Sequence, residues 1–263
     1  MLLSTIKMRR LQFLQQHKHE DNTMKTLSVF LLCALAISAC SKRDPILPGE
    51  RSDIFDSYEV VVKNQELPEL SAEITNISGG KDCDYRQDAQ NVIWVSDKKI
   101  WSGFATNNAV KSEQSPICDG NFIYTGLSTG EVVKINTNTK KQVWSTDVYR
   151  ANNLTGGASV VDIIAHVGLD GKYVYAGGLG DSFCKLNAYN GDKVWCVNIS
   201  VPVDFIMVDG FIFVVGTDNN LYAINKQNGD VYWKTEIKKQ VMPIYDGKNI
   251  IVGREKINYK NGQ

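Results

Sequence analysis

The stretch "DGNFIYTGLSTGEVVKINTNTKKQVWSTDV", residues 119–148, decides the fold because later stretches repeat its pattern. The second copy is "DGKYVYAGGLGDSFCKLNAYNGDKVWCVNI" (170–199), and the third, one residue shorter, is "DGFIFVVGTDNNLYAINKQNGDVYWKTEI" (209–237). The separations from Asp to Trp are 25, 25 and 24 residues, for Asp119 to Trp144, Asp170 to Trp195 and Asp209 to Trp233. A fourth copy starts at Asp246. Repetition at a period of about 40 residues is typical of a repeat architecture.

Each copy has turn signals at the spacing typical of short β-strands. An Asp-Gly pair predicts a tight turn, and it recurs at Gly120, Gly171, Gly210 and Gly247. A β-rich run, a Gly-rich turn, a second alternating run and a strand ending in Trp follow, and nothing shows helical periodicity. Four strands in a repeat of about 40 residues indicate a β-propeller. The sequence therefore predicts an all-β fold of four-stranded blades.

The spacing "G-x-[VI]-Y … G-x-[LV]-x-x-[IL]-N … G-x-x-x-W" resembles the PQQ-type propeller repeat. The resemblance implies that the Trp of each copy packs between neighbouring blades, at Trp144, Trp195 and Trp233. A buried Trp covers about 150–250 Å². We therefore interpret these residues, with the turn glycines, as structural blade residues and not as cofactor ligands.

The beginning of the chain has the pattern of a lipoprotein signal. Lys25 precedes thirteen apolar or small residues, 27–39, which are too few to span a bilayer and end at Cys40. This pattern resembles a bacterial lipobox, which implies that Cys40 is the site of lipid attachment. We assign residues 1–39 to the signal region. Because residues 1–23 fit a signal poorly and Met24 makes a better start, residues 1–23 are interpreted as a start-site artefact.

The lipobox together with the repeats resembles the BamB family, lipoproteins of the machinery that assembles outer-membrane β-barrels. The resemblance implies a non-catalytic scaffold without a cofactor, anchored by lipid at the periplasmic face of the outer membrane. Its implied partner is the central barrel-inserting protein, through BamA-like periplasmic domains. Ser41, where an Asp would favour inner-membrane retention, is consistent with the outer membrane.

The rest of the chain is predicted to consist of a tether followed by a propeller. Residues 40–90 are predicted to be the lipidated tether and a lead-in strand, and residues 91–263 the PQQ-like repeats with the last blade incomplete. The family's propeller has eight blades, whereas this length accommodates about four to five. We therefore expect a truncated member or a fragment.

Charge and cysteine content limit the other possibilities. Of 29 basic and 29 acidic residues, five and two precede residue 40, which leaves 24 against 27 and gives no basic surface for nucleic acid. Cys83, Cys118, Cys184 and Cys196 form no C-x-x-C pair, so a structural zinc site or metal centre is not expected. Cys184 and Cys196 flank a predicted hairpin, where either a disulfide or buried free thiols are compatible with the pattern.

The repeats are also compatible with two other functions. A periplasmic PQQ-dependent enzyme, or its remnant, is disfavoured because the adjacent cysteines of those enzymes are absent. A generic propeller binding module remains open, because it needs only loops. His166, the one histidine after residue 40, is expected to be structural, and "AGGLGD" (176–181) to be a turn.

The best candidate for a partner-binding loop is the irregular connection between the first two copies. Their Asp residues are 51 positions apart, from 119 to 170, against 39 between the next two. The excess includes Tyr149, Arg150 and Asn153, which are residue types suited to interfaces. A solvated connection is the alternative.

Overall fold

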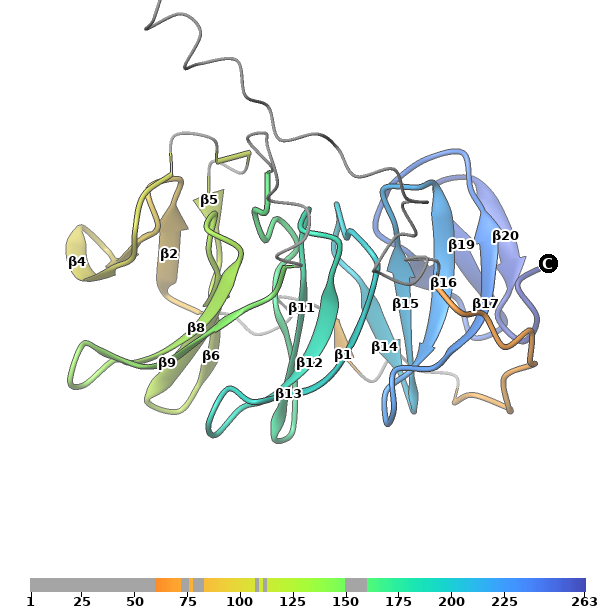
Figure 1. The fold of residues 1–263 in the computed structure, drawn as a ribbon, viewed down its shortest axis with the longest axis horizontal. Coiled ribbons are helices and arrows are strands. Elements are labelled where there is room, and N and C mark those ends of the chain that lie inside the picture. The colour runs from red at the N-terminus through yellow and green to blue at the C-terminus, as the bar shows by residue number, and fades with distance from the viewer. Residues whose placement is uncertain (1–59, 72–75, 78–82, 107–108, 111–112, 150–159) are drawn as a thin grey trace, which may run out of the picture. The chain divides into compact units, whose positions relative to one another are not determined.

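The computed structural model describes residues 60–71, 76–77, 83–106, 109–110, 113–149 and 160–263, all within one compact unit, Phe55–Gln263. Their secondary structure consists of β-strands arranged in five sheets that follow one another along the chain (Figure 1). None of these residues forms a helix long and apolar enough to cross a membrane. The prediction of an all-β propeller with four to five blades is confirmed.

The second, third and fourth blades are built from consecutive strands in which each strand pairs with the next. The second blade contains β6 (Ile117–Asp119), β7 (Phe122–Gly126), β8 (Glu131–Asn136) and β9 (Lys141–Asp147). The third contains β10 (Gly168–Asp170), β11 (Tyr173–Gly177), β12 (Phe183–Asn187) and β13 (Lys193–Val197). The fourth contains β14 (Ile206–Val208), β15 (Phe211–Val215), β16 (Asn220–Asn225) and β17 (Val231–Glu236). These are the three copies seen in the sequence.

The two remaining blades depart from this plan. The fifth has three strands, β18 (Ile244–Tyr245), β19 (Asn249–Val252) and β20 (Glu255–Asn258). The first contains β2 (Tyr85–Asp88), β3 (Val92–Val95), β4 (Lys98–Ser102) and β5 (Glu113–Gln114), in the order β4-β3-β2-β5. Its strand β2 lies within the range 40–90 that the sequence assigned to the tether and lead-in strand.

Strand register identifies Trp101 as the first blade's equivalent of the three repeat tryptophans. Trp144 pairs with Lys134 of β8, and the register then shifts by a bulge at the next residue. Trp101 pairs with Ile93 of β3 immediately before the same kind of shift. The first blade therefore follows the repeat even though its sequence lacks the Asp-Gly and Asn-Gly signals.

The N-terminal strap, residues 60–71, covers the edge of the fourth blade. Val62 forms a parallel bridge with Val231 of β17, and the N–H of Lys63 donates to the Val231 carbonyl at 2.9 Å. The N–H of Leu67 reaches the Lys260 carbonyl beyond β20 at 2.8 Å, and the Leu67 side chain is buried. A further strand, β1 (Asn76–Ile77), pairs antiparallel with β14. Residues near the beginning of the unit thus hold blades near its end.

The turn at Gly210 explains why the third copy is one residue shorter. In the second blade Asp119 pairs with Phe122, so Gly120 occupies the turn with a left-handed φ of 56°. In the fourth blade Val208 pairs with Phe211, which moves Asp209 into the left-handed position at φ 50°. Asp tolerates this conformation better than most residues, and Gly210 is not the residue with positive φ. Gly171 and Gly247 keep positive φ values, 57° and 88°.

Apolar clusters fill the spaces between consecutive blades. The cluster between the second and third blades contains Tyr124 and Trp144 on one side and Val174 and Leu186 on the other. Similar clusters join the third blade to the fourth and the fourth to the fifth. At about 25 cal/mol per Å² of buried apolar surface, these interfaces supply the main cohesion of the array.

Candidate partner-binding site

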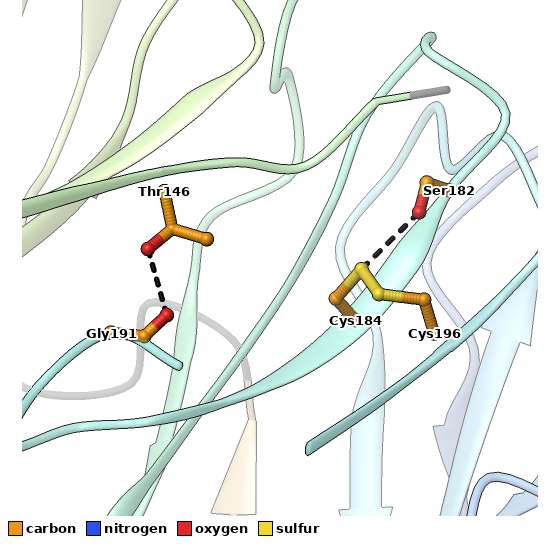
Figure 2. The surroundings of a disulfide bond; sticks show 5 residues. All are labelled: Thr146, Ser182, Cys184, Gly191 and Cys196. Carbon is orange, nitrogen blue, oxygen red and sulfur yellow. Dashed lines mark hydrogen bonds between the residues drawn. A yellow bond between two sulfur atoms is a disulfide. The ribbon is translucent and has the colours of Figure 1, made fainter. Parts of the chain in front are cut away.

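A specific contact, made by Trp144, joins the second blade to the third. Its indole N–H donates to the carbonyl of Ala188 at 3.2 Å, and the ammonium of Lys134 donates to the same oxygen at 2.8 Å. Gly191 lies against the indole, since a Cβ there would be 2.8 Å from the Trp144 ring. Beside it, the hydroxyl of Thr146 donates to the Gly191 carbonyl at 2.7 Å (Figure 2).

The same arrangement recurs at the next two interfaces, and we call it the tryptophan junction: an indole N–H donating to the following blade's carbonyl, with a left-handed glycine against the ring. Trp195 donates to the Lys226 carbonyl at 3.2 Å, with Gly229 against its ring. Trp233 donates to the Tyr259 carbonyl at 3.0 Å, with Gly262 against its ring. These tryptophans join blades, and the rigid frame they make positions the loops.

Two disulfides reinforce this frame. Cys184 pairs with Cys196 directly across the β12–β13 hairpin, and Ser182 lies 3.2 Å from the Cys184 sulfur (Figure 2). The sequence left open whether these two residues are bonded or free, and the structure contains the bond. A second bond, Cys83–Cys118, was not predicted and joins the first blade to the second.

The hollow that we regard as the candidate binding site lies among the connections between blades. It has a volume of about 520 Å³, and its lining residues are Val110, Ile164, Pro202, Val203, Asp204, Gln240, Val241 and Met242. Ile164, Val203 and Gln240 each stand six residues before the Asp of an Asp-Gly turn. Because they occupy the same place in successive repeats, the propeller brings them to one surface. We call this feature the connection hollow.

Hydrogen bonds fix the backbone around the connection hollow. The carboxylate of Asp204 accepts from the backbone N–H of His166 at 2.7 Å, and His166 Nδ1 lies 3.0 Å from the same carboxylate. The buried carboxylate of Asp162 accepts from the N–H of Val110 at 2.7 Å. These bonds tie the β4–β5, β9–β10 and β13–β14 connections together, so hydrogen bonds hold the backbone that carries the lining side chains. His166 is thus found in an ion-pair geometry with Asp204.

The structure places only one of the residues predicted for the partner loop. Tyr149 is half-buried and lies close to the backbones of Gly130 and Gly180, where an added Cβ would come within 2.6 and 2.5 Å of it. The nearby Asp147 carboxylate, followed by burial and Glu131, raises the pKa of Tyr149. Arg150 and Asn153 lie outside the described residues, as does Cys40.

Sequence reasoning missed the connection hollow. A signal was present, because "DIIAHV" (162–167), "VPVDFI" (201–206) and "KKQVMP" (238–243) each begin eight residues before the Asp of an Asp-Gly turn. Their apolar residues point to burial or to a partner, and only the structure distinguishes the two. Among the described residues no group of three or more His, Cys, Asp or Glu side chains is arranged to hold a metal ion.

The five sheets and their tryptophan junctions define the class of protein as a β-propeller of PQQ-like repeats. A family model described as "Outer membrane protein assembly factor BamB" matches residues 66–235. The chain belongs to this family.

Curated relatives agree with this membership, and a solved structure agrees with the fold. The chain is 24% identical over 216 residues to the outer membrane protein assembly factor BamB of Yersinia pestis, covering 80% of this chain and 46% of the relative. It is 26% identical over 154 residues to that of Francisella salina, covering 56% of this chain and 30% of the relative. The crystal structure of BamB from Moraxella catarrhalis is similar with a TM-score of 0.56 at 19% identity, covering 70% of this chain and 57% of that one. The chain thus spans less than half the length of either relative.

Proposed function

We propose that this chain is a non-catalytic, lipid-anchored scaffold of the machinery that assembles outer-membrane β-barrel proteins. Family membership supports this function, because the relatives it matches are named outer membrane protein assembly factors. In the proposal the chain binds the periplasmic domains of the central barrel-inserting protein. Lipid on Cys40 holds it at the periplasmic face of the outer membrane.

The connection hollow is the observation that carries the proposal. Its wall combines apolar side chains, including Ile164, Val203 and Met242, with the carboxylate of Asp204. Two valines at its border are unusually exposed for apolar residues, Val110 at 58% and Val241 at 37%. Concave surfaces of this composition, presented by a rigid backbone, suit an apolar anchor residue of a protein partner.

The proposed contact has a defined chemistry. An apolar side chain of the partner enters between Val203 and Met242, and a neighbouring cation of the partner approaches the Asp204 carboxylate. The desolvated apolar contact supplies most of the affinity, while the charge fixes orientation. The loop with Tyr149, Arg150 and Asn153 is proposed as a second contact region.

A crosslinked pull-down from native membranes tests the proposal. The tagged full-length chain is crosslinked in its own cells, and its partners are identified by mass spectrometry. Recovery of the barrel-inserting protein supports the scaffold function, whereas recovery of chaperones alone contradicts it. The absorbance spectrum of the purified chain tests the enzyme alternative, because a quinone band would show a quinoprotein.

Two matched substitutions locate the contact. Val241→Glu places a charge at the border of the connection hollow and should lower recovery of the barrel-inserting protein by at least about tenfold, since burying an unpaired charge at an interface is costly. Val143→Glu places the same charge on β9, outside the residues that line the hollow, at a valine that is 48% exposed. Equal recovery with both variants would remove the hollow from the proposal.

A further inference from the structure

The interface between the first and second blades is built differently from the other three. Its apolar cluster contains five buried residues, and Ile93 is the one among them that the first blade supplies. Much of the remaining contact is polar. The buried amide of Gln87 donates to the Gly126 carbonyl at 2.9 Å, and the Ser128 N–H donates to the Asn91 amide oxygen at 3.0 Å.

This interface also lacks the glycine of a tryptophan junction. Glycines 191, 229 and 262 each follow a strand-ending Asn by four residues, at Asn187, Asn225 and Asn258. The matching position after Asn136 is Lys140, which adopts the left-handed conformation at φ 56°. Trp101, the equivalent tryptophan, is half-buried, as Trp195 is, whereas Trp144 and Trp233 are buried. The first blade is therefore attached by less apolar contact than the later blades.

The Cys83–Cys118 disulfide is placed to compensate for this difference. Cys83 stands two residues before β2 begins, and Cys118 lies on β6 of the second blade. The two cysteines are 35 residues apart, and the loop that they close contains β2, β3, β4 and β5. A covalent bond around a loop lowers the entropy that the enclosed segment gains when it detaches. Both cysteines are partly exposed, so a small reductant can reach the bond.

We propose that Cys83–Cys118 is a redox-sensitive tie for the first blade: its reduction releases that blade while the later blades stay folded. A dithiol supplies two electrons and two protons, so the S–S bond breaks to give two cysteine thiols and the reductant becomes a cyclic disulfide. Release also displaces Val110, which lies within the same closed loop and borders the connection hollow. The proposed release of the first blade does not require that the chain bind any particular partner.

Hydrogen–deuterium exchange of the full chain tests the proposal. The Cys184→Ala/Cys196→Ala variant holds the tie as its one remaining bond among the described cysteines, and dithiothreitol is the reductant. Reduction should accelerate exchange in β2, β3 and β4 by roughly a hundredfold, because a disulfide of this kind contributes a few kcal/mol. Exchange in β11, β12, β15 and β16 should stay unchanged.

A Cys83→Ala/Cys118→Ala variant provides the matched comparison. Its first blade should exchange rapidly without reductant, and dithiothreitol should have no further effect on that blade. The proposal is wrong if the first blade of the reduced protein remains as protected as in the oxidised protein. It is equally wrong if all five blades lose protection together. If the alanine pair prevents folding, reduction of the protein folded with its disulfide still decides between these outcomes.

Discussion

The indole N–H of Trp233 donates to the carbonyl of Tyr259, at 3.0 Å, across the boundary between the fourth and fifth blades. Both groups are buried, so neither has water as a ready substitute partner. The bond ties the side chain of one repeat to the backbone of the next. It therefore couples the stability of neighbouring blades, as nearest-neighbour contacts do in repeat proteins.

Trp233→Phe should destabilise the protein by about 1 to 3 kcal/mol, because it leaves the buried Tyr259 carbonyl without this donor and reduces the packed volume. Urea denaturation followed by fluorescence measures the loss as a lower midpoint. Trp94→Phe is the control, since Trp94 is half-buried within the first blade and donates to Asp88 of the same blade at 2.8 Å. An equal loss in both variants would contradict a special role for the junction.

Gly191→Ala should destabilise the protein more than Gly120→Ala. Both glycines have positive φ, 81° and 56°, so alanine strains each by about 1 kcal/mol. At Gly191 the new Cβ also meets the Trp144 ring at 2.8 Å, whereas at Gly120 nothing lies within 4 Å. Overpacking should add about 1 to 3 kcal/mol at Gly191 alone. Urea midpoints of the two variants measure the difference, and equal midpoints would contradict it.

Cys40→Ala should abolish lipid attachment. Each buried lipid methylene contributes about 0.8 kcal/mol, so the acyl chains proposed for Cys40 would give the stable anchor that the proposed scaffold requires. Incorporation of labelled palmitate in growing cells measures attachment. Cys33→Ala, within the apolar run 27–39, is the control and should take up label as the unaltered chain does. Label that persists in Cys40→Ala would rule out this attachment site.

Much of the fold could be predicted because its three central blades repeat one pattern. The first blade was harder to recognise, since Asn91 and Ser96 adopt the left-handed conformation that glycine usually marks. Its register also places Arg86 and Trp94 where the second blade has the buried Ile123 and Ile135. The first blade therefore lacks the Asp-Gly and Asn-Gly signals by which the other copies were found.

The candidate site could not be predicted from the sequence, because its residues are brought together only by the packing of the blades. Ile164, Val203 and Gln240 belong to three different connections, and only the stacking of blades brings them to one hollow. The Cys83–Cys118 bond likewise joins two different blades, so the pattern of a single hairpin could not predict it. By contrast, Cys184 and Cys196 flank one hairpin, so a bond between them could be considered from the sequence alone. Strand register places the two residues directly opposite each other.

Tyr124 provides a titration that reports on the junction between the second and third blades. Its ring packs near Trp144 with centroids 6.0 Å apart, and its side chain is almost completely buried. Burial, with a smaller effect of the Asp119 carboxylate, raises the pKa of Tyr124 to about 12 from an ordinary value of 10.0. The folded state therefore holds this proton more tightly than the unfolded state.

The stability that Tyr124 contributes should be fully present below pH 10 and should be lost as the pH rises through about 12, because the unfolded chain releases the phenol proton first. Tyr124→Phe removes this ionisation, so its free energy of unfolding should fall less steeply than that of the unaltered protein over this range, by roughly 2 kcal/mol. Urea denaturation at pH 9 to 12 measures the two slopes. Tyr189→Phe alters a tyrosine that is 83% exposed and should keep the slope of the unaltered protein. If Tyr124→Phe also keeps that slope, the buried phenol is not the group that controls alkaline stability.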